Sequence, residues 1–203
     1  IVVAAATSDG YKATNVDLDD GAVWVTDAST NKMGRLVIAI DQVDYLQDRG
    51  ALSAAGVPDR LMQGAEAGLR LVLRRVGAGA IADLSLDRLD VEFSGGPRSG
   101  AIFDAIFSRP LPVLARKAEA AAPFHLAGLP DLIGIRDDEA LLPRLRPSFE
   151  GYRLMREYFL MPDRFHYLRL DGLNPALRAC TSGPCEVVVY LDTARPELSD
   201  IAA

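Results

Sequence analysis

The sequence contains few of the residues that most often carry chemistry: its 203 residues include two cysteines, two histidines and one tryptophan. Two thiols cannot complete a tetrahedral zinc site, and His125 and His166 stand at no ligand spacing to Cys180 and Cys185. The sequence also lacks the glycine-rich, zinc-protease and serine-hydrolase patterns that mark common cofactor and catalytic sites. We therefore expect no cofactor, no metal and no catalytic residue.

A basic surface and a long apolar run are also missing. The formal net charge of −6 argues against a nucleic-acid partner, because proteins that bind nucleic acid normally present a basic face. No apolar run reaches the roughly 18 residues that a membrane-spanning helix needs, so we expect no direct membrane insertion. The opening residues lack the basic region of a signal peptide, so we expect none. The sequence does not begin with methionine and its end gives no obvious terminus, so we expect a piece of a longer protein.

Polar and apolar residues alternate over several short stretches, which predicts β-strands. The expected strands are residues 22–26, 34–40, 69–76, 86–93, 113–119 (an exposed edge strand), 165–170 and 186–192 (a central strand). The strands at 69–76 and 86–93 are natural antiparallel neighbours. Cross-strand ion pairs are then expected between their charged residues: Arg70 or Arg74 with Asp90 or Glu92.

Helical patterns are fewer. Residues 101–109 follow a glycine-rich turn at 94–100 and place their large apolar residues on one helical face. Residues 41–58 read as a short helix or an irregular link. The order of the elements predicts an α+β fold, a mostly antiparallel sheet or sandwich-like structure with two or three inserted helices.

The most informative stretch predicts a helix over residues 148–161, with Ser148 as its N-cap and Pro162 ending it. Its charged residues fall within about a third of the helical wheel: Glu150, Arg153, Arg156 and Glu157. Apolar and aromatic side chains fill the remainder, so we expect a helix that is buried over most of its circumference. Replacing Tyr158 or Phe159 by alanine would then leave a cavity and cost roughly 3–5 kcal/mol.

Three weaker patterns leave other interpretations open. Cys185 precedes a strand, and His125 or His166 could activate it, or Cys180, in a Cys/His-dependent hydrolase. One thiol and two histidines nevertheless occur in many non-enzymes. Cys180 and Cys185 could close a hairpin disulfide, but reduced thiols agree better with the absence of a secretory signal. Asp137–Glu139 could bind a hard cation, but three adjacent acids in a loop are usually solvated or cap a helix.

At residues 146–173 the sequence "RPSFEGYRLMREYFLMPDRFHYLRLDGL" closely resembles the signature of the TssF family, also called VasA or ImpG. Upstream pieces of the sequence agree with the family in order, and the resemblance covers roughly residues 40–200. It implies a weakly defined N-terminal β segment over residues 1–55 and an α+β core domain over 56–203. The residues that carry the signature include Phe149, Gly151, Tyr152, Glu157, Tyr158, Phe159, Pro162, Phe165 and Gly172.

The resemblance implies structural work in a type VI secretion baseplate. TssF-like proteins form baseplate wedges with TssG, contact TssK and resemble phage-tail baseplate proteins, so we expect TssG-like and TssK-like partners and a second copy of the protein. The assembly is expected in the cytoplasm, at the inner face of the bacterial inner membrane. A hydrolase and a generic small-ligand module remain the alternatives.

A partner surface is expected in the long segment 118–146, which has little periodicity but many apolar residues. Loops of this length in a compact domain are usually functional or disordered. A loop with this many apolar residues is not typical of disorder. The candidate interface residues are Phe124, Leu129, Leu132 and Arg136. Changing Arg136 to glutamate together with Leu132 to aspartate is expected to weaken assembly and to leave the isolated fold intact.

Overall fold

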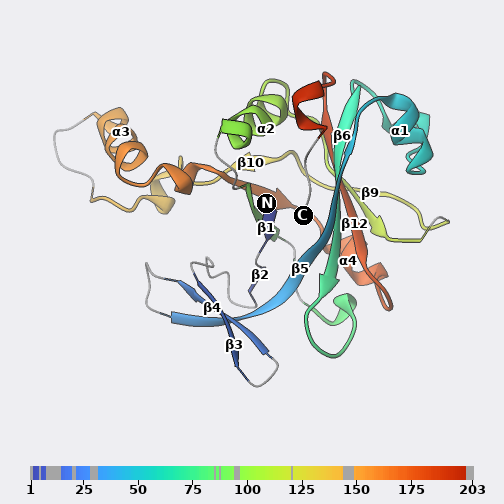
Figure 1. Ribbon diagram of the computed structural model, residues 1–203, viewed down its shortest axis with the longest axis horizontal. Coiled ribbons are helices and arrows are strands. Elements are labelled where there is room, and N and C mark those ends of the chain that lie inside the picture. The colour runs from blue at the N-terminus through green and yellow to red at the C-terminus, as the bar shows by residue number, and fades with distance from the viewer. Residues whose placement is uncertain are drawn as a thin grey trace.

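The computed structural model describes residues 2–4, 6–7, 15–19, 22–27, 32–84, 86, 88–93, 97–119, 121–143 and 149–199. Within these residues, two antiparallel β-sheets and four α-helices form an α+β fold (Figure 1). The expected fold class is therefore confirmed, with four helices in place of two or three.

The larger sheet has the strand order β3-β4-β5-β6-β12-β8-β9, and β2 pairs with β5. Its strands are β2 (Ala6–Thr7), β3 (Asn15–Asp19), β4 (Ala22–Asp27), β5 (Lys32–Leu46), β6 (Ala67–Arg75), β8 (Leu114–Lys117), β9 (His125–Leu126) and β12 (Cys185–Leu191). Every residue of β12 is buried, because both faces of the sheet are covered there. Val187 and Val189 point into the main core, whereas Val188 and Tyr190 join a second apolar cluster on the opposite face.

The smaller sheet has the order β1-β7-β11-β10. Its strands are β1 (Val2–Ala4), β7 (Arg88–Phe93), β10 (Asp131–Leu132) and β11 (Tyr167–Asp171). Leu71 of the larger sheet and Val91 and Leu168 of the smaller one belong to the same core cluster. The main core therefore lies between the sheets, which gives the sandwich-like arrangement that the sequence predicts.

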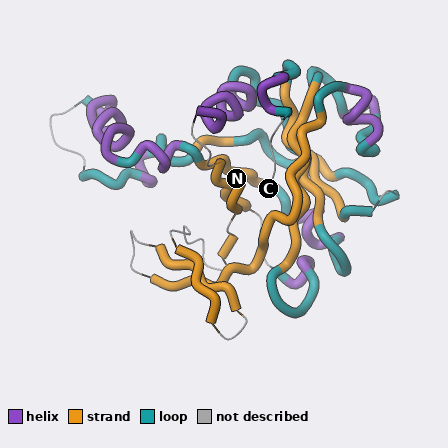
Figure 2. Tube along the Cα trace, viewed as in Figure 1, coloured by secondary structure: helices purple, strands orange, loops and turns teal. Residues whose placement is uncertain are grey.

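The helices cover the sheets, apart from one (Figure 2). They are α1 (Arg49–Ala54), α2 (Pro97–Phe107), α3 (Glu150–Leu160) and α4 (Asn174–Ala179), with short 3-10 turns η1 (Asp59–Leu61), η2 (Ile81–Asp83), η3 (Asp137–Glu139), η4 (Pro162–Phe165) and η5 (Pro196–Leu198). Helix α2 closes the main core, and Phe103 packs edge-on against Phe93 at 5.7 Å between ring centroids. Helix α1 covers the second apolar cluster through Leu52.

The expected pairing of residues 69–76 with 86–93 is wrong. Strand β6 lies between β5 and β12, whereas β7 belongs to the other sheet, between β1 and β11. Both strands bury one face in the main core, so they meet across it and not side by side. Alternation of apolar residues identifies the buried face of a strand, but it does not identify the neighbouring strand.

The predicted cross-strand ion pairs are wrong for the same reason. Arg70 Nε donates to Glu186 on β12 at 2.6 Å, and Arg74 Nε donates to Asp41 on β5. Glu186 also accepts from Arg116 Nε of β8 at 2.9 Å. A buried carboxylate between two guanidiniums, one on each neighbouring strand, thus joins three strands on one face of the sheet.

Two further expectations are corrected in the larger sheet. Residues 113–119 are not an exposed edge, because β8 lies between β12 and β9 and Leu114 and Ala115 are buried. Residues 41–46 are not helix or link but the end of the long strand β5, and α1 begins only at Arg49. The turn expected at 94–100 falls partly outside the described residues, and α2 begins at Pro97. The domain division after residue 55 stays a prediction.

Candidate assembly surface on helix α3

Helix α3 lies at one end of the molecule, apart from both sheets (Figure 1). We call residues 149–165, which include α3 and η4, the α3 arm. The helix ends at Leu160, and Met161 adopts φ −145° and ψ 68°, outside the helical region, as expected for a residue before proline. Pro162 therefore ends the helix as the sequence predicts. Ser148, the expected N-cap, is outside the described residues.

The burial of α3 differs from the expected pattern, because two charged residues are buried and most of the large apolar ones are exposed. Arg153 and Glu157 are 7% and 2% exposed, whereas Phe159 is 76% exposed. The other exposed apolar residues of the arm are Phe149, Tyr152, Met155, Tyr158, Leu160 and Met161. The prediction of a helix buried on its apolar side is therefore wrong. The loss of roughly 3–5 kcal/mol in stability expected on replacing Tyr158 or Phe159 by alanine is then no longer expected, because removing an exposed ring leaves no cavity.

The contacts of Glu157 explain how two charged residues of the helix, Arg153 and Glu157, can be buried. Its carboxylate accepts hydrogen bonds from the backbone N–H groups of Leu141 and Leu142 at 3.1 and 3.0 Å, and from Arg153 Nη1 at 3.0 Å. Arg164 Nη1 of η4 donates to its other oxygen. A buried charge is tolerated when it is paired and hydrogen-bonded, and Glu157 meets both conditions.

The same contacts connect the arm to the smaller sheet. Arg164 donates to the carbonyl oxygen of Glu139, and the Glu139 carboxylate accepts from Gly134 N at 2.7 Å and from Arg169 Nη1 at 2.5 Å. Arg169 of β11 also pairs with Asp90 of β7 at 3.3 Å. We call Arg153, Glu157, Arg164, Glu139 and Arg169 the anchor cluster. It holds α3 by charge where most helices are held by an apolar stripe.

The pKa values of the two anchor carboxylates follow from these contacts. Burial alone would raise the pKa of Glu157, but the Leu142 N–H and the guanidiniums of Arg153 and Arg164 outweigh it and lower that pKa below its ordinary value. For Glu139, burial is again outweighed, by Gly134 N–H and Arg169, so its pKa is lowered too. Both groups are therefore carboxylates in the folded protein at neutral pH.

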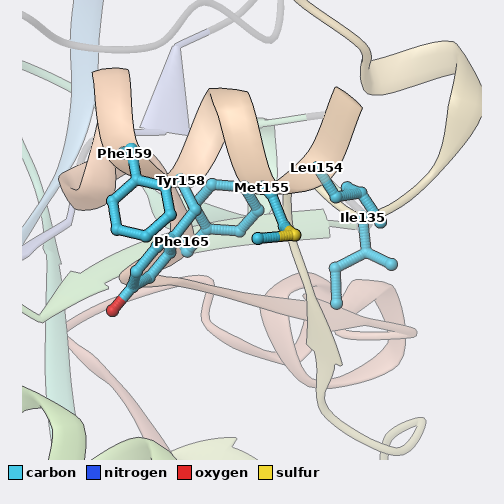
Figure 3. A pocket seen from close by; sticks show the side chains of 6 residues that line it. All are labelled: Ile135, Leu154, Met155, Tyr158, Phe159 and Phe165. Carbon is cyan, nitrogen blue, oxygen red and sulfur yellow. The ribbon is translucent and has the colours of Figure 1, made fainter. Parts of the chain in front are cut away.

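The exposed side of α3 forms a second distinct feature, which we call the apolar face: Tyr152, Met155, Tyr158, Phe159 and Leu160. A hollow of about 400 Å³ lies on this side of the helix, and Figure 3 shows the side chains that line it. It is lined by Ile135, Leu154, Met155, Tyr158, Phe159 and Phe165, none of which carries a charge. Ile135 comes from the segment before η3, so the loop and the helix build one continuous apolar surface.

A second hollow of about 610 Å³ lies on the other side of Met155 and Phe159, lined by Tyr152, Met155, Arg156, Phe159 and Leu160. Met155 and Phe159 line both hollows and form a ridge between them. Among the described residues that line this hollow, Arg156 is the one with a charged side chain. Contiguous exposed apolar surface of this kind is typical of sites that bind another protein, a membrane or a ligand, so α3 is a candidate binding surface.

Several signature residues have a structural role beside this surface. The ring of Phe149 lies over Gly151, where a Cβ would collide with it, and meets Tyr152 edge-on at 6.1 Å between centroids. Gly172 adopts φ +77°, and a Cβ there would lie 3.3 Å from the backbone nitrogen of Gly128. Glycine avoids both the left-handed strain and this contact.

The four interface candidates from the sequence do not lie together on the apolar face. Leu129 is 57% exposed, and Arg136 is exposed and paired with Asp131. Phe124 is partly buried and stacks on the guanidinium of Arg116 at 4.2 Å. Leu132 packs against the main core, so its change to aspartate would disturb the fold. The residues that sequence reasoning missed are the signature aromatics themselves, which it assigned to the core.

Three of the residues considered for chemistry, Cys180, Cys185 and Glu139, are buried or already paired. Both cysteines are free and buried, so no disulfide forms between them. The hydrogen bond with Cys180 and burial raise the pKa of the Cys185 thiol, which makes it a poor nucleophile. Within Asp137–Glu139, the carboxylate of Glu139 already accepts hydrogen bonds from Gly134 N and Arg169. The described part of the chain contains no group of three His, Cys, Asp or Glu side chains placed to hold a metal ion.

Comparison with known proteins identifies the family. A sequence model of the family described as "Type VI secretion system, TssF" matches residues 30–203, so the chain belongs to the TssF family of type VI secretion components. The resemblance in the signature stretch is thereby confirmed. None of the helices in the described residues has the length and apolarity needed to cross a membrane.

Two relatives show how much of a TssF protein is present. The type VI secretion system component TssF1 of Pseudomonas aeruginosa strain PAO1 is 35% identical over 161 residues, which cover 75% of this chain and 25% of that protein. The chain thus spans about a quarter of the length of this curated relative. A chain of the TssK-TssF-TssG baseplate subcomplex, solved by cryo-electron microscopy, matches with a TM-score of 0.60 and 17% identity, over 98% of this chain and 37% of that chain. That likeness shows the shared fold.

Proposed function

We propose that this chain is a structural, non-enzymatic part of a type VI secretion baseplate subunit and that it acts by protein–protein assembly. The observation that carries the proposal is the exposed apolar face of α3, in a chain of the TssF family. An isolated domain gains nothing from exposing aromatic side chains, whereas an assembly buries them at an interface. The buried thiols give no support to a Cys/His-dependent hydrolase.

The partners we propose are TssG-like and TssK-like baseplate subunits, together with a second copy of the parent protein in the same wedge. The solved chain with this fold belongs to a TssK-TssF-TssG subcomplex, which supports that choice. The assembly would stand in the cytoplasm at the inner face of the inner membrane, as the platform of a phage-tail-like contractile machine. Leu129 and Arg136 remain candidates for a second contact surface.

Co-purification tests this proposal. The full-length parent is co-expressed with the TssG-like and TssK-like subunits of the same bacterium, and the products are separated by size-exclusion chromatography and weighed by native mass spectrometry. We expect a stoichiometric complex that contains the parent. A parent that elutes alone, with both other subunits folded and present at equal concentration, would refute the assembly function.

A further inference from the structure

We propose that the apolar face of α3 receives an amphipathic helix from a partner subunit, and that this helix places an acidic side chain opposite Arg156. The inference rests on the proposed assembly function and adds to it the surface, the shape and the charge of the occupant.

The shape of the apolar face fits a helix. Met155 and Phe159 are four residues apart, so they form a ridge along the helix with a hollow on each side. Helices pack by setting the ridges of one into the grooves of the other. The eleven residues of α3 extend over about 16 Å, which matches roughly three turns of a partner helix. Apolar side chains spaced three or four residues apart on that helix would enter both hollows.

The charge of the occupant follows from Arg156. This side chain is exposed, and its neighbours one helical turn away are Tyr152, Arg153, Phe159 and Leu160. None of them is acidic, so α3 offers Arg156 no counter-ion at the spacings that stabilise helical ion pairs. When a partner covers the adjoining hollow, the guanidinium loses water. A carboxylate on the partner then compensates for this loss, and arginine is favoured at such interface positions.

The same charge disfavours a second copy of this chain as the occupant. Two α3 helices packed face to face around a two-fold axis would bring Arg156 of one copy near Arg156 of the other. Glu157 cannot relieve this repulsion, because it is buried and held by Arg153 and Arg164.

The described ends of the chain also do not reach the apolar face. Strand β1 pairs with β7 in the smaller sheet, and Leu198 of η5 is buried in the main core. Both elements lie beside the sheets, away from α3 (Figure 1). Neither described end of the chain therefore covers the apolar face.

Charge reversal and cross-linking test the inference in the full-length parent, with the TssG-like and TssK-like subunits as the probes. Arg156→Glu is expected to weaken the complex about 30-fold or more, the loss typical of an interface hot spot of 2 kcal/mol. Arg178→Glu, an exposed arginine on the distant helix α4, serves as the matched control and should leave the affinity unchanged. Circular dichroism of both variants verifies that the fold is intact.

A photo-reactive benzoyl-phenylalanine in place of Phe159 identifies the occupant. We expect a cross-link to a helical segment of one of the two other subunits, and exchange of an acid in that segment for arginine should restore binding to Arg156→Glu. A cross-link to a second copy, to the parent's own chain or to no protein would overturn the inference. So would equal binding of Arg156→Glu and wild type. In each of these cases the baseplate function stands as long as the wild-type complex forms.

Discussion

Replacing Glu157 by glutamine should release the α3 arm without unfolding the rest of the chain. The change is almost isosteric, but it removes the negative charge shared by Arg153 and Arg164, both of which are buried. Breaking a buried ion pair by neutralising one partner costs about 3–5 kcal/mol, because an uncompensated charge stays behind. The substitution does not touch the main core. It should therefore lower the free energy of local opening of the arm and leave the stability of the core unchanged.

Native-state hydrogen exchange of the α3 amides measures this opening directly. A loss of about 3 kcal/mol corresponds to exchange roughly a hundredfold faster in α3. The strands β6 and β12 should keep their protection. The matched control is Glu66→Gln, which removes an exposed carboxylate paired with Arg49 at 3.7 Å and should cost less than about 1 kcal/mol. Unchanged protection of α3 in Glu157→Gln would show that the anchor cluster does not hold the arm.

The same group gives the arm a dependence on pH. The pKa of Glu157 is lowered in the folded state. The folded protein with the arm in place therefore binds fewer protons than the protein with the arm detached. Its stabilising contribution is complete above the ordinary glutamate pKa of about 4.3 and is lost as the pH falls through the lower, folded value. Exchange in α3, corrected for the intrinsic rate at each pH, should therefore accelerate on acidification. Glu157→Gln should show a smaller acceleration, which comes from Glu139 alone, and an equal pH dependence in both proteins would contradict the assignment.

Four further changes separate structural from interface residues. Phe159→Ala should alter the free energy of unfolding by no more than about 0.5 kcal/mol in urea titrations, because the ring is exposed, and a loss of several kcal/mol would show that it is buried. Gly172→Ala should cost at least about 1–2 kcal/mol, the price of a left-handed residue, and unchanged stability would contradict the observed φ. Cys185→Ser should lower the free energy of unfolding by roughly 1–3 kcal/mol, because the buried serine hydroxyl would lack a good hydrogen-bond partner. Baseplate assembly and secretion should persist, and loss of secretion by a stably folded variant would support the hydrolase hypothesis. Leu129→Asp with Arg136→Glu should weaken the co-purified complex and leave the melting temperature unchanged, and a complex of full affinity would remove this segment from the interface.

Much of the local structure was predictable from sequence. The alternation in residues 69–76 and the apolar run in 186–192 located β6 and the central strand β12, because a strand shows its buried face with a period of two residues. Pro162 located the end of α3, since the residue before a proline avoids helical geometry. The signature in residues 146–173 indicated the family, which the match over residues 30–203 then confirmed.

The partners of each strand were not predictable from the same pattern. The alternation of apolar residues in β6 and β7 is compatible with two arrangements. The two strands could be neighbours in one sheet, or they could belong to two sheets that face each other across a core. Only the tertiary structure distinguishes these arrangements, because the segment between the two strands carries the chain from one sheet to the other. Arg70 consequently pairs with Glu186, which is 116 residues away in sequence. Patterns among residues near in sequence do not predict a pair so widely separated along the chain.

The orientation of α3 was decided by tertiary structure alone. An amphipathic pattern fixes which residues share a side of a helix, but the choice of the side that turns inward depends on what the rest of the protein supplies. Here the chain supplies Arg164 and two backbone N–H groups to Glu157, so this buried carboxylate is satisfied within the fold. The aromatic side finds no such cover within the described part of the chain and faces solvent.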